Sequence, residues 1–413
     1  MRTIAALLAL SASVLAQDPA AYPTFRGANR DGHSPDKGLL RQWPTGGPKL
    51  AWKVSGLGAG YAGVAAYGGK LYTLADLGDE CALVCLDAAD GKTLWTTKFG
   101  KTFVFDGKPT WGNNRATPTT DGKIVIALGA MGELLCVDAA TGKEIWKKDL
   151  KKDFDGKVGR WEYSESPTID GDNVVCVAGG SKGAVLALKK TDGSQVWRST
   201  EFTDAAEYAS LVTAEIGGVR QYIVYTMKTV AGVATTGGKL LWRISRPNGD
   251  VAVIPTPVVK DDIIFTSSSY KAGENAYRVT SSGGAFKAVE IYKGDHMQNH
   301  HGGVILVGDH LYGVSDPNPS MLRCIELKTG KVVWEQKTPK GSLGFADGLL
   351  IARAESDRNP EVILIDASPA GYKELGRFKQ PEPSTFPKWA HPTIYNGKLY
   401  LRDWDKLFAY EVK

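Results

Sequence analysis

The stretch "LLCVDAATGKEIW" (134–146) contains two short apolar runs separated by a tight turn. Gly142 lies in the turn, and Trp146 closes the second run. Two strand-like runs joined by a turn that contains glycine indicate a β-hairpin, because glycine adopts the positive φ that tight turns require. The stretch therefore predicts two adjacent antiparallel strands.

The same phrase is repeated along the chain. It returns at 83–95, 185–197, 230–242 and 322–334, and degenerate copies end at Tyr292 and Phe378. Trp95, Trp146 and Trp197 follow one another at intervals of 51 residues. A second phrase, strand–turn–strand, lies between the hairpins in eight copies, such as "TPTTDGKIVIAL" (117–128) and "HPTIYNGKLYL" (391–401). Repeats of this length with four strands each are typical of propeller blades.

The two ends of the repeat region complete the count. The chain stops at "LFAYEVK" (407–413), after the third strand of its last unit, while "PKLAWKV" (48–54) supplies an unpaired fourth strand that carries Trp52. Pairing these segments removes the open edges of a linear array. The sequence predicts an all-β fold: an eight-bladed β-propeller of four-stranded antiparallel blades over residues 48–413, with the ring closed by its N- and C-terminal strands. The repeated tryptophan is expected on each outermost strand, wedged between neighbouring blades.

The segment before the propeller predicts export. Residues 1–16 combine an early positive charge, an apolar run and a small-residue end, which is typical of a secretory signal peptide. Gln17 follows, in place of the cysteine of a lipoprotein, so we expect a periplasmic or secreted protein that is not a lipoprotein. No later run is long enough for a transmembrane segment. Residues 17–47 form an N-terminal leader.

Charge and cysteine usage narrow the function classes. The net charge of +5 is spread evenly, which gives no reason to expect nucleic acid as a partner. Three of the five cysteines, Cys85, Cys136 and Cys324, lie in apolar strand-like runs, so we expect small buried thiols in preference to a disulfide framework.

The pattern D-A-x-T-G-K-x-x-W, complete at 138–146 and partial at 87–95, resembles the pyrroloquinoline quinone (PQQ)-like repeat. That repeat occurs in eight-bladed quinoprotein alcohol dehydrogenases and in outer-membrane assembly factors of the BamB type. The leader stretch "YPTFRGANRDGHSP" (22–35) is also similar to the opening of exported PQQ-like repeat proteins. The resemblance implies the propeller fold and two classes of function, binding scaffold and oxidoreductase.

The chain departs from the enzymes of that family. Quinoprotein alcohol dehydrogenases hold the quinone against a disulfide between adjacent cysteines, whereas the closest cysteines here are Cys81 and Cys85. Their calcium-binding Glu-Asn-Asp set and catalytic Asp have no matching positions. The sequence names no cofactor and disfavours PQQ. The leading hypothesis is therefore a non-enzymatic exported scaffold that binds a ligand or a protein, with the cell envelope as one setting. The alternative is a quinoprotein-like, PQQ-dependent oxidoreductase.

Aligning the first strands of the eight units brings two columns of residues into register. The outer column consists of Tyr61, Arg115, Ser164, Tyr208, Ile254, His301, Lys340 and Trp389. The inner column consists of Gly63, Thr117, Ser166, Ser210, Thr256, Gly303, Ser342 and His391. Small inner residues suit the crowded axis of a propeller. The aromatic and cationic outer column is typical of a pocket at one mouth of the channel.

These columns predict the ligand-binding residues, with ordinary loop packing as the alternative. The candidates are Arg115, Glu165, Tyr208, His301, Lys340, Trp389 and His391. The mouth should be cationic, more so with a protonated His301. We therefore expect a small anionic or planar acidic ligand that pairs with Arg115 and stacks on Trp389 or Tyr208, or an envelope protein as partner. Replacing Arg115 with Ala is expected to abolish binding and leave stability nearly unchanged.

The histidine-rich stretch "HMQNHHGG" (296–303) raises the question of a metal site. On a strand, His300 and His301 would point to opposite faces, so they are not expected to chelate one ion together. His391 is the expected histidine neighbour of His301. Two histidines without a matching carboxylate or thiolate are a weak ligand set, and no metal site is predicted.

Overall fold

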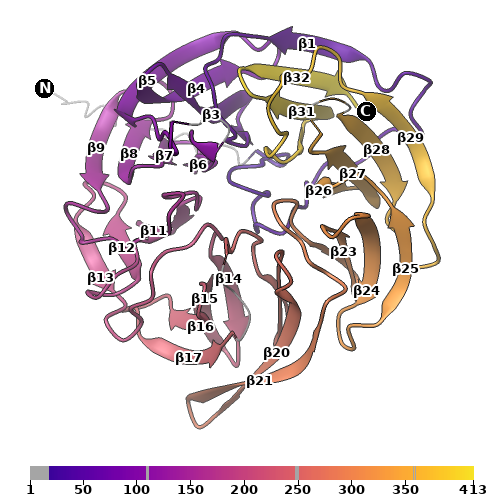
Figure 1. Cartoon of the computed structure of the whole chain (residues 1–413). Helices are drawn as coiled ribbons and strands as arrows, with labels where there is room; N and C mark the ends of the chain where they lie inside the picture. Colours follow the sequence, from indigo (N-terminus) through magenta and orange to yellow (C-terminus); the bar gives the residue numbers. More distant parts are fainter. Residues whose placement is uncertain (1–17, 108–110, 247–250, 357, 359) are drawn as a thin grey trace, which may run out of the picture.

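The computed structural model describes residues 18–107, 111–246, 251–356, 358 and 360–413. The predicted signal peptide, residues 1–16, lies outside the described residues. The strands form a closed ring of eight four-stranded antiparallel sheets around a central axis (Figure 1). The predicted eight-bladed β-propeller is confirmed.

The first four blades follow one another along the chain. Blade 1 contains β2 (Ala65–Tyr67), β3 (Lys70–Leu77), β4 (Glu80–Asp87) and β5 (Thr93–Lys101). Blade 2 contains β6 (Thr119–Thr120), β7 (Ile124–Leu128), β8 (Glu133–Asp138) and β9 (Glu144–Asp149). Blade 3 contains β10 (Thr168–Asp170), β11 (Asn173–Val177), β12 (Val185–Lys189) and β13 (Gln195–Arg198). Blade 4 contains β14 (Val212–Ile216), β15 (Val219–Tyr225), β16 (Thr229–Ala234) and β17 (Leu240–Ser245).

The remaining blades continue in the same order. Blade 5 contains β18 (Val258–Lys260), β19 (Ile263–Ser268), β20 (Gly273–Ser282) and β21 (Ala285–Gly294). Blade 6 contains β22 (Ile305–Val307), β23 (His310–Ser315), β24 (Met321–Glu326) and β25 (Val332–Lys337). Blade 7 contains β26 (Gly341–Ala346), β27 (Leu349–Ala354), β28 (Glu361–Asp366) and β29 (Glu374–Lys379). Blade 8 contains β30 (Thr393–Tyr395), β31 (Lys398–Asp403), β32 (Lys406–Glu411) and β1 (Leu50–Val54).

Blade 8 closes the ring as the sequence predicts. Strand β1, near the start of the propeller, pairs antiparallel with β32, the last strand of the chain. Trp52 lies opposite Ala409, and Val54 lies opposite Leu407. The ring is therefore held shut by backbone hydrogen bonds between segments some 350 residues apart in sequence.

The repeated tryptophans lie on the outermost strands and contact the next blade. Trp95 of blade 1 packs on Gly142, in the turn of blade 2, and Trp146 of blade 2 packs on Gly193 of blade 3. The Nε1–H of Trp146 also donates to the carbonyl of Lys190, 2.8 Å away. These tryptophans therefore join neighbouring blades, because each aromatic ring covers a turn that belongs to another sheet.

The leader crosses the ring near its axis. Residues 18–47 are drawn in indigo in Figure 1, and part of this segment passes through the centre of the ring. The Arg26 guanidinium donates to the carbonyl of Val304 in blade 6 at 2.6 Å. Arg30 donates to the carbonyls of Pro167, before blade 3, and Leu211, before blade 4. The leader therefore ties together blades on different sides of the axis and closes one end of the channel.

The cysteines of the described residues are not joined by disulfide bonds. Cys81, Cys85, Cys136, Cys176 and Cys324 are all buried free thiols. The part of the chain that the structure describes has no helix of the length and apolarity needed to cross a membrane.

Candidate functional site

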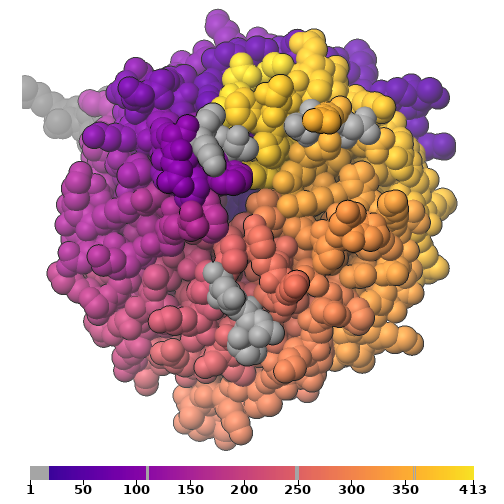
Figure 2. Space-filling model, viewed as in Figure 1, coloured from indigo at the N-terminus to yellow at the C-terminus, as the bar shows by residue number. Residues whose placement is uncertain are grey.

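A cavity of about 550 Å³ lies on the propeller axis. Figure 2 shows the face of the molecule hollowed at its centre, with indigo atoms of the leader at the bottom of the hollow. Phe25 of the leader is part of the lining. The volume is within the range of small-molecule sites. All eight residues of the outer column line this cavity, as do Gly63, Ser166 and His391 of the inner column.

The inner column links the segments that lead into the first strands of neighbouring blades. The backbone N–H of Thr117 donates to Ser166 Oγ at 2.9 Å, and the N–H of Ser166 donates to Ser210 Oγ at 3.0 Å. Small hydroxyl residues fit here because the blades are too close at the axis for larger side chains. The inner column therefore packs the blades together at the base of the cavity, where Gly63, Ser166 and His391 also form part of its lining.

Arg115 lies in the wall of the cavity, just before blade 2. Its Nη1 donates to the carbonyl of Trp161 at 2.7 Å and to Ser164 Oγ at 3.0 Å, and its Nη2 donates to the carbonyls of Trp111 and Gly112. Burial lowers the pKa of Arg115 to about 10, so the group stays charged at neutral pH. Within the described residues no carboxylate forms an ion pair with it, so its charge is held by neutral acceptors.

These four hydrogen bonds correct one expectation. Arg115 connects its own segment to the segment before blade 3, so it has a structural role in addition to any ligand contact. Replacing it with Ala would leave buried acceptors without a donor, and such losses cost stability. A loss of stability in the Ala variant is therefore not evidence against ligand binding.

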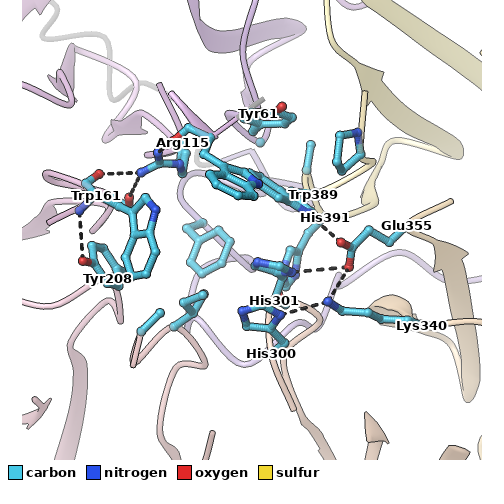
Figure 3. A pocket seen from close by; sticks show the side chains of 18 of the residues that line it. Tyr61, Arg115, Trp161, Tyr208, His300, His301, Lys340, Glu355, Trp389 and His391 are labelled. Carbon is cyan, nitrogen blue, oxygen red and sulfur yellow. Dashed lines mark hydrogen bonds and ion pairs between the residues drawn. The ribbon is translucent and has the colours of Figure 1, made fainter. Parts of the chain in front are cut away.

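Aromatic rings cover much of the cavity wall (Figure 3). The Trp389 indole stacks on the His301 ring, with centroids 4.8 Å apart, and lies 4.4 Å from the ring of Tyr61 on another side. Trp161 meets Tyr208 edge to face at 5.9 Å, and the Tyr208 hydroxyl accepts a hydrogen bond from the backbone N–H of Trp161. Such surfaces suit a planar ligand, because offset and edge contacts with aromatic rings are favourable.

The second cation of the column, Lys340, lies among acidic and histidine side chains. Its Nζ is 3.3 Å from Asp316 Oδ2, 3.2 Å from Glu355 Oε2 and 2.9 Å from His300 Nδ1. The ammonium group therefore lies where these three side chains converge, and Figure 3 shows its contacts with Glu355 and His300. Its charge is compensated by two carboxylates, unlike that of Arg115.

The histidine pair does not have the predicted orientation. His300 and His301 lie in a bend before β22, which begins at Ile305, so the alternation of a strand does not apply. Their rings are side by side, with centroids 3.7 Å apart. The prediction that they face apart is wrong for this reason. The described residues contain no group of three or more His, Cys, Asp or Glu that could hold a metal ion.

His301 does not add to the positive charge of the mouth. Burial, with the neighbouring His300, lowers the pKa of His301 to about 4. The imidazole is therefore neutral at neutral pH, so the additional positive charge that a protonated His301 would bring is absent. His391 behaves similarly: burial lowers its pKa to about 3, and its Nε2 donates to the carbonyl of His301 at 2.6 Å.

Glu165 lies apart from the cavity. It is fully buried behind the wall, and its Oε2 accepts the backbone N–H of Val177 at 2.7 Å. Burial raises the pKa of Glu165 to about 7. Its neighbour Ser164 faces the cavity, and adjacent residues of an extended segment point in opposite directions. The expected contribution of Glu165 to the rim is therefore not seen.

Several lining residues were missed by sequence reasoning. They are Phe25, Trp111, Trp161, Tyr270, His300 and Glu355. Glu355 and Asp316 share a signal that the columns did not use: each directly follows the second strand of its blade, β27 and β23 respectively. A third column built on that position would have found both.

The lining was also tested against the quinone that the resemblance implies. No cysteine lines the cavity. The two nearby carboxylates, Asp316 and Glu355, already contact Lys340 and the histidines, so neither is available as a ligand in a calcium site. The residues present therefore do not fit the disulfide and calcium arrangement of the quinoprotein dehydrogenases.

The closed ring of blades, the sequence repeat and the cavity on the axis together define an eight-bladed propeller of the PQQ-like repeat class. The family profile described as "Outer membrane protein assembly factor BamB" matches residues 42–128 and 104–336. The chain belongs to this family.

Individual relatives are more distant. A tetrathionate hydrolase from Acidithiobacillus ferrooxidans is 22% identical over 346 residues, which is 80% of this chain and 56% of the hydrolase. The assembly factor BamB of Burkholderia pseudomallei is 28% identical over 111 residues, 27% of this chain and 24% of that protein. The chain thus spans about half of the first relative and a quarter of the second.

Solved structures show the same fold. BamB from Moraxella catarrhalis matches with a TM-score of 0.62 at 12% identity, over 88% of this chain and 99% of that one. A quinohemoprotein alcohol dehydrogenase from Comamonas testosteroni matches with a TM-score of 0.67 at 11% identity, over 95% and 80% of the two chains. Both a protein-assembly factor and a dehydrogenase share the architecture, so the fold alone does not choose between binding and catalysis.

Proposed function

We infer that the protein is a ligand-binding propeller whose axial cavity holds a small anionic compound with a planar group. The observation that carries this proposal is the charge of Arg115, which lines the cavity without a carboxylate partner among the described residues. Its hydrogen-bond acceptors are neutral, so the guanidinium keeps its positive charge in the cavity wall, and that charge favours an anion.

The floor of the cavity supports the same sign of charge. Arg26 and Arg30 of the leader are buried and donate to backbone carbonyls, and neither forms an ion pair within the described part of the chain. Burial lowers the pKa of Arg30 to about 10, so it remains charged at neutral pH. Three guanidinium groups thus lie in or beneath the cavity, while the charge of Lys340 is balanced by Asp316 and Glu355.

Calorimetric titration with simple probes tests the proposal. Wild-type protein should bind 2-naphthoate or 2-naphthalenesulfonate at least tenfold more tightly than the neutral 2-naphthylmethanol. Arg115→Ala should weaken binding of the anions by roughly 10- to 100-fold, which is the usual range for a lost charge-assisted hydrogen bond. Arg115→Lys should retain part of the affinity because it keeps the charge.

A matched control separates the site from general electrostatics. Arg278 lies on β20 at the outside of the ring and pairs with Asp262, so Arg278→Ala changes the net charge equally without touching the cavity. Its affinity for the anions should equal that of wild type. Equal binding of charged and neutral probes by wild type would contradict the proposal.

Protein binding is the second candidate function, and the match to the assembly-factor family favours it. A partner on the broad outer faces of the ring would still be captured by Arg115→Ala. We also propose export to the periplasm or beyond, without a lipid anchor, on the pattern of residues 1–16 and residue Gln17. Fractionation of cells that express the full chain, followed by mass determination of the mature N-terminus, tests this placement.

A further inference from the structure

The side chain of His301 has a fixed tautomer. Its Nδ1 is 3.3 Å from Glu355 Oε2, and Glu355 Oε1 accepts the Nε1–H of Trp389 at 2.8 Å. Burial by itself would raise the pKa of Glu355, but the hydrogen bond from His301 and the charge of Lys340 outweigh it and hold that pKa well below its usual range. An ionised carboxylate only accepts hydrogen bonds, so the proton of the neutral imidazole must be on Nδ1.

The other ring nitrogen, Nε2, therefore carries a lone pair. In an imidazole ring Nε2 lies on the edge away from Nδ1, so it faces away from Glu355 (Figure 3). No hydrogen-bond partner for this atom exists within the described residues, and it is not sealed from the cavity that His301 lines. The ring itself is held between His300 and Trp389, with centroids 3.7 Å and 4.8 Å away, so the lone pair has a fixed direction.

This nitrogen is suited to accept a hydrogen bond and poorly suited to remove a proton. A general base works best when its pKa is near the operating pH. The pKa of His301 is lowered to about 4, mainly by burial. A neutral, oriented acceptor such as His301 Nε2 favours a ligand that carries a hydrogen-bond donor. A ligand without a donor would cover this nitrogen and leave it unsatisfied, which costs free energy.

His301 and Arg115 lie on different sides of the cavity. Arg115 precedes blade 2 and His301 precedes blade 6, four blades apart in a ring of eight. The two residues therefore lie on opposite sides of the axis, with Trp389 between them at the wall (Figure 3).

We propose that the ligand of this cavity carries two groups at opposite ends: an anionic group for Arg115, and an N–H or O–H donor for His301 Nε2. This assignment rests on the proposed function, and it narrows the class of ligand to hydroxy- or amino-substituted planar acids. His301 is then a specificity-determining residue, held in position by Glu355.

Matched pairs of probes test this assignment by calorimetry. Each pair differs only in the donor: 4-hydroxybenzoate with 4-fluorobenzoate, and 6-hydroxy-2-naphthoate with 6-fluoro-2-naphthoate. In the pair of suitable length, wild type should bind the hydroxyl compound roughly tenfold more tightly, as expected for one satisfied hydrogen bond. His301→Phe keeps a flat ring but has no acceptor, and it should bring this ratio to about one.

Two controls accompany the variant. His296→Phe is the same substitution in the same segment at a half-exposed side chain outside the cavity lining, and it should keep the wild-type ratio. Arg115→Ala should weaken both members of a pair by the same factor. Nitrogen NMR of histidine-labelled wild type gives an answer that needs no variant: Nε2 of His301 should be unprotonated, and the hydroxyl probe should shift its resonance.

The outcomes separate the two proposals. Equal binding of hydroxyl and fluoro compounds by wild type overturns the role of His301 and leaves anion binding standing. A ratio that persists in His301→Phe, or a protonated Nε2 in the wild-type spectrum, also overturns it. If no member of either pair binds, both proposals fail.

Discussion

The indole ring of Trp95 in blade 1 covers Gly142 in the turn of blade 2, so closely that a Cβ built on Gly142 would lie 2.5 Å from Trp95 Cε3. The φ of Gly142 is +71°, in the left-handed region. This glycine is therefore required twice, by backbone conformation and by the neighbouring aromatic ring.

Substitution of this glycine should show both requirements. We expect Gly142→Ala to lower the free energy of unfolding by roughly 2–5 kcal/mol, from left-handed strain and from displacement of the indole. Gly171→Ala is the matched control, because Gly171 has a φ of +58° but open space around the added Cβ. It should cost only about 1–2 kcal/mol, for strain alone. Urea unfolding measures both, and equal losses would show that the indole contact is unimportant.

Closure of the ring predicts a global effect of a terminal deletion. Removing residues 407–413 deletes most of β32, which pairs with β31 on one side and β1 on the other. We expect the whole ring to lose cooperative thermal unfolding, because the deletion opens two strand edges at once. Removal of the exposed Lys413 alone is the control and should have little effect. A truncated chain that keeps the wild-type transition would contradict closure as the source of stability.

The buried Glu165 predicts a pH-dependent stability. Its pKa is raised by burial from 4.5 to about 7, so between these values the folded chain holds a proton that the unfolded chain has released. The stabilisation of the folded state that protonated Glu165 contributes is fully present below pH 4.5, and it is lost as the pH rises through 7. Glu165→Gln mimics the protonated form, so its stability relative to wild type should increase by about 3 kcal/mol between pH 4.5 and pH 8.

Unfolding by urea at several pH values measures this difference. His301 and His391, whose lowered pKa values act in the opposite direction below pH 6.5, are present in both proteins and cancel in the comparison. A stability difference between Glu165→Gln and wild type that does not change with pH would contradict a raised pKa of Glu165.

The environment of Lys340 predicts a larger effect than a surface ion pair would give. Lys340→Met leaves Asp316 and Glu355 without their cation, and we expect a loss of about 1–3 kcal/mol, since these carboxylates are mostly buried but the lysine is partly exposed. The pKa of His301 should rise, because the charge of Lys340 helps to lower it. Lys98→Met removes an exposed pair with Glu80 and should cost less than about 1 kcal/mol. Denaturation and histidine NMR titration measure the two effects.

The fold was predictable because the sequence repeats the same blade unit along the chain. Each copy carries the same glycine turn and closing aromatic, and the unpaired strand with Trp52 indicated how the ring closes. The alignment of the repeat units then placed the outer column, from Tyr61 to Trp389, around one cavity, in the segments just before the first strands. Strand register transfers from blade to blade because every blade has the same relation to the axis.

The site was only partly predictable, because its charges depend on residues outside that register. Glu355 neutralises Lys340 and orients His301, yet it follows a second strand and was not in either column. His300 and His301 lie in a bend before β22, as Tyr208 lies in a bend before β14, so strand alternation does not apply there and gave the wrong orientation. The leader contributes Phe25 to the lining from far away in sequence, and nothing in its local pattern indicates this.

The leader also decides how molecules exchange with the cavity. Phe25 lines the cavity, and Arg26 and Arg30 tie the same leader segment to the segments before blades 3, 4 and 6, so the leader covers one end of the cavity. We expect exchange at the face of the ring that is hollowed in Figure 2, and the exposed Trp111 is part of the cavity lining. Entry and release rates therefore share one gatekeeping surface, and a change at the rim should alter both rates together while leaving the equilibrium affinity largely unchanged.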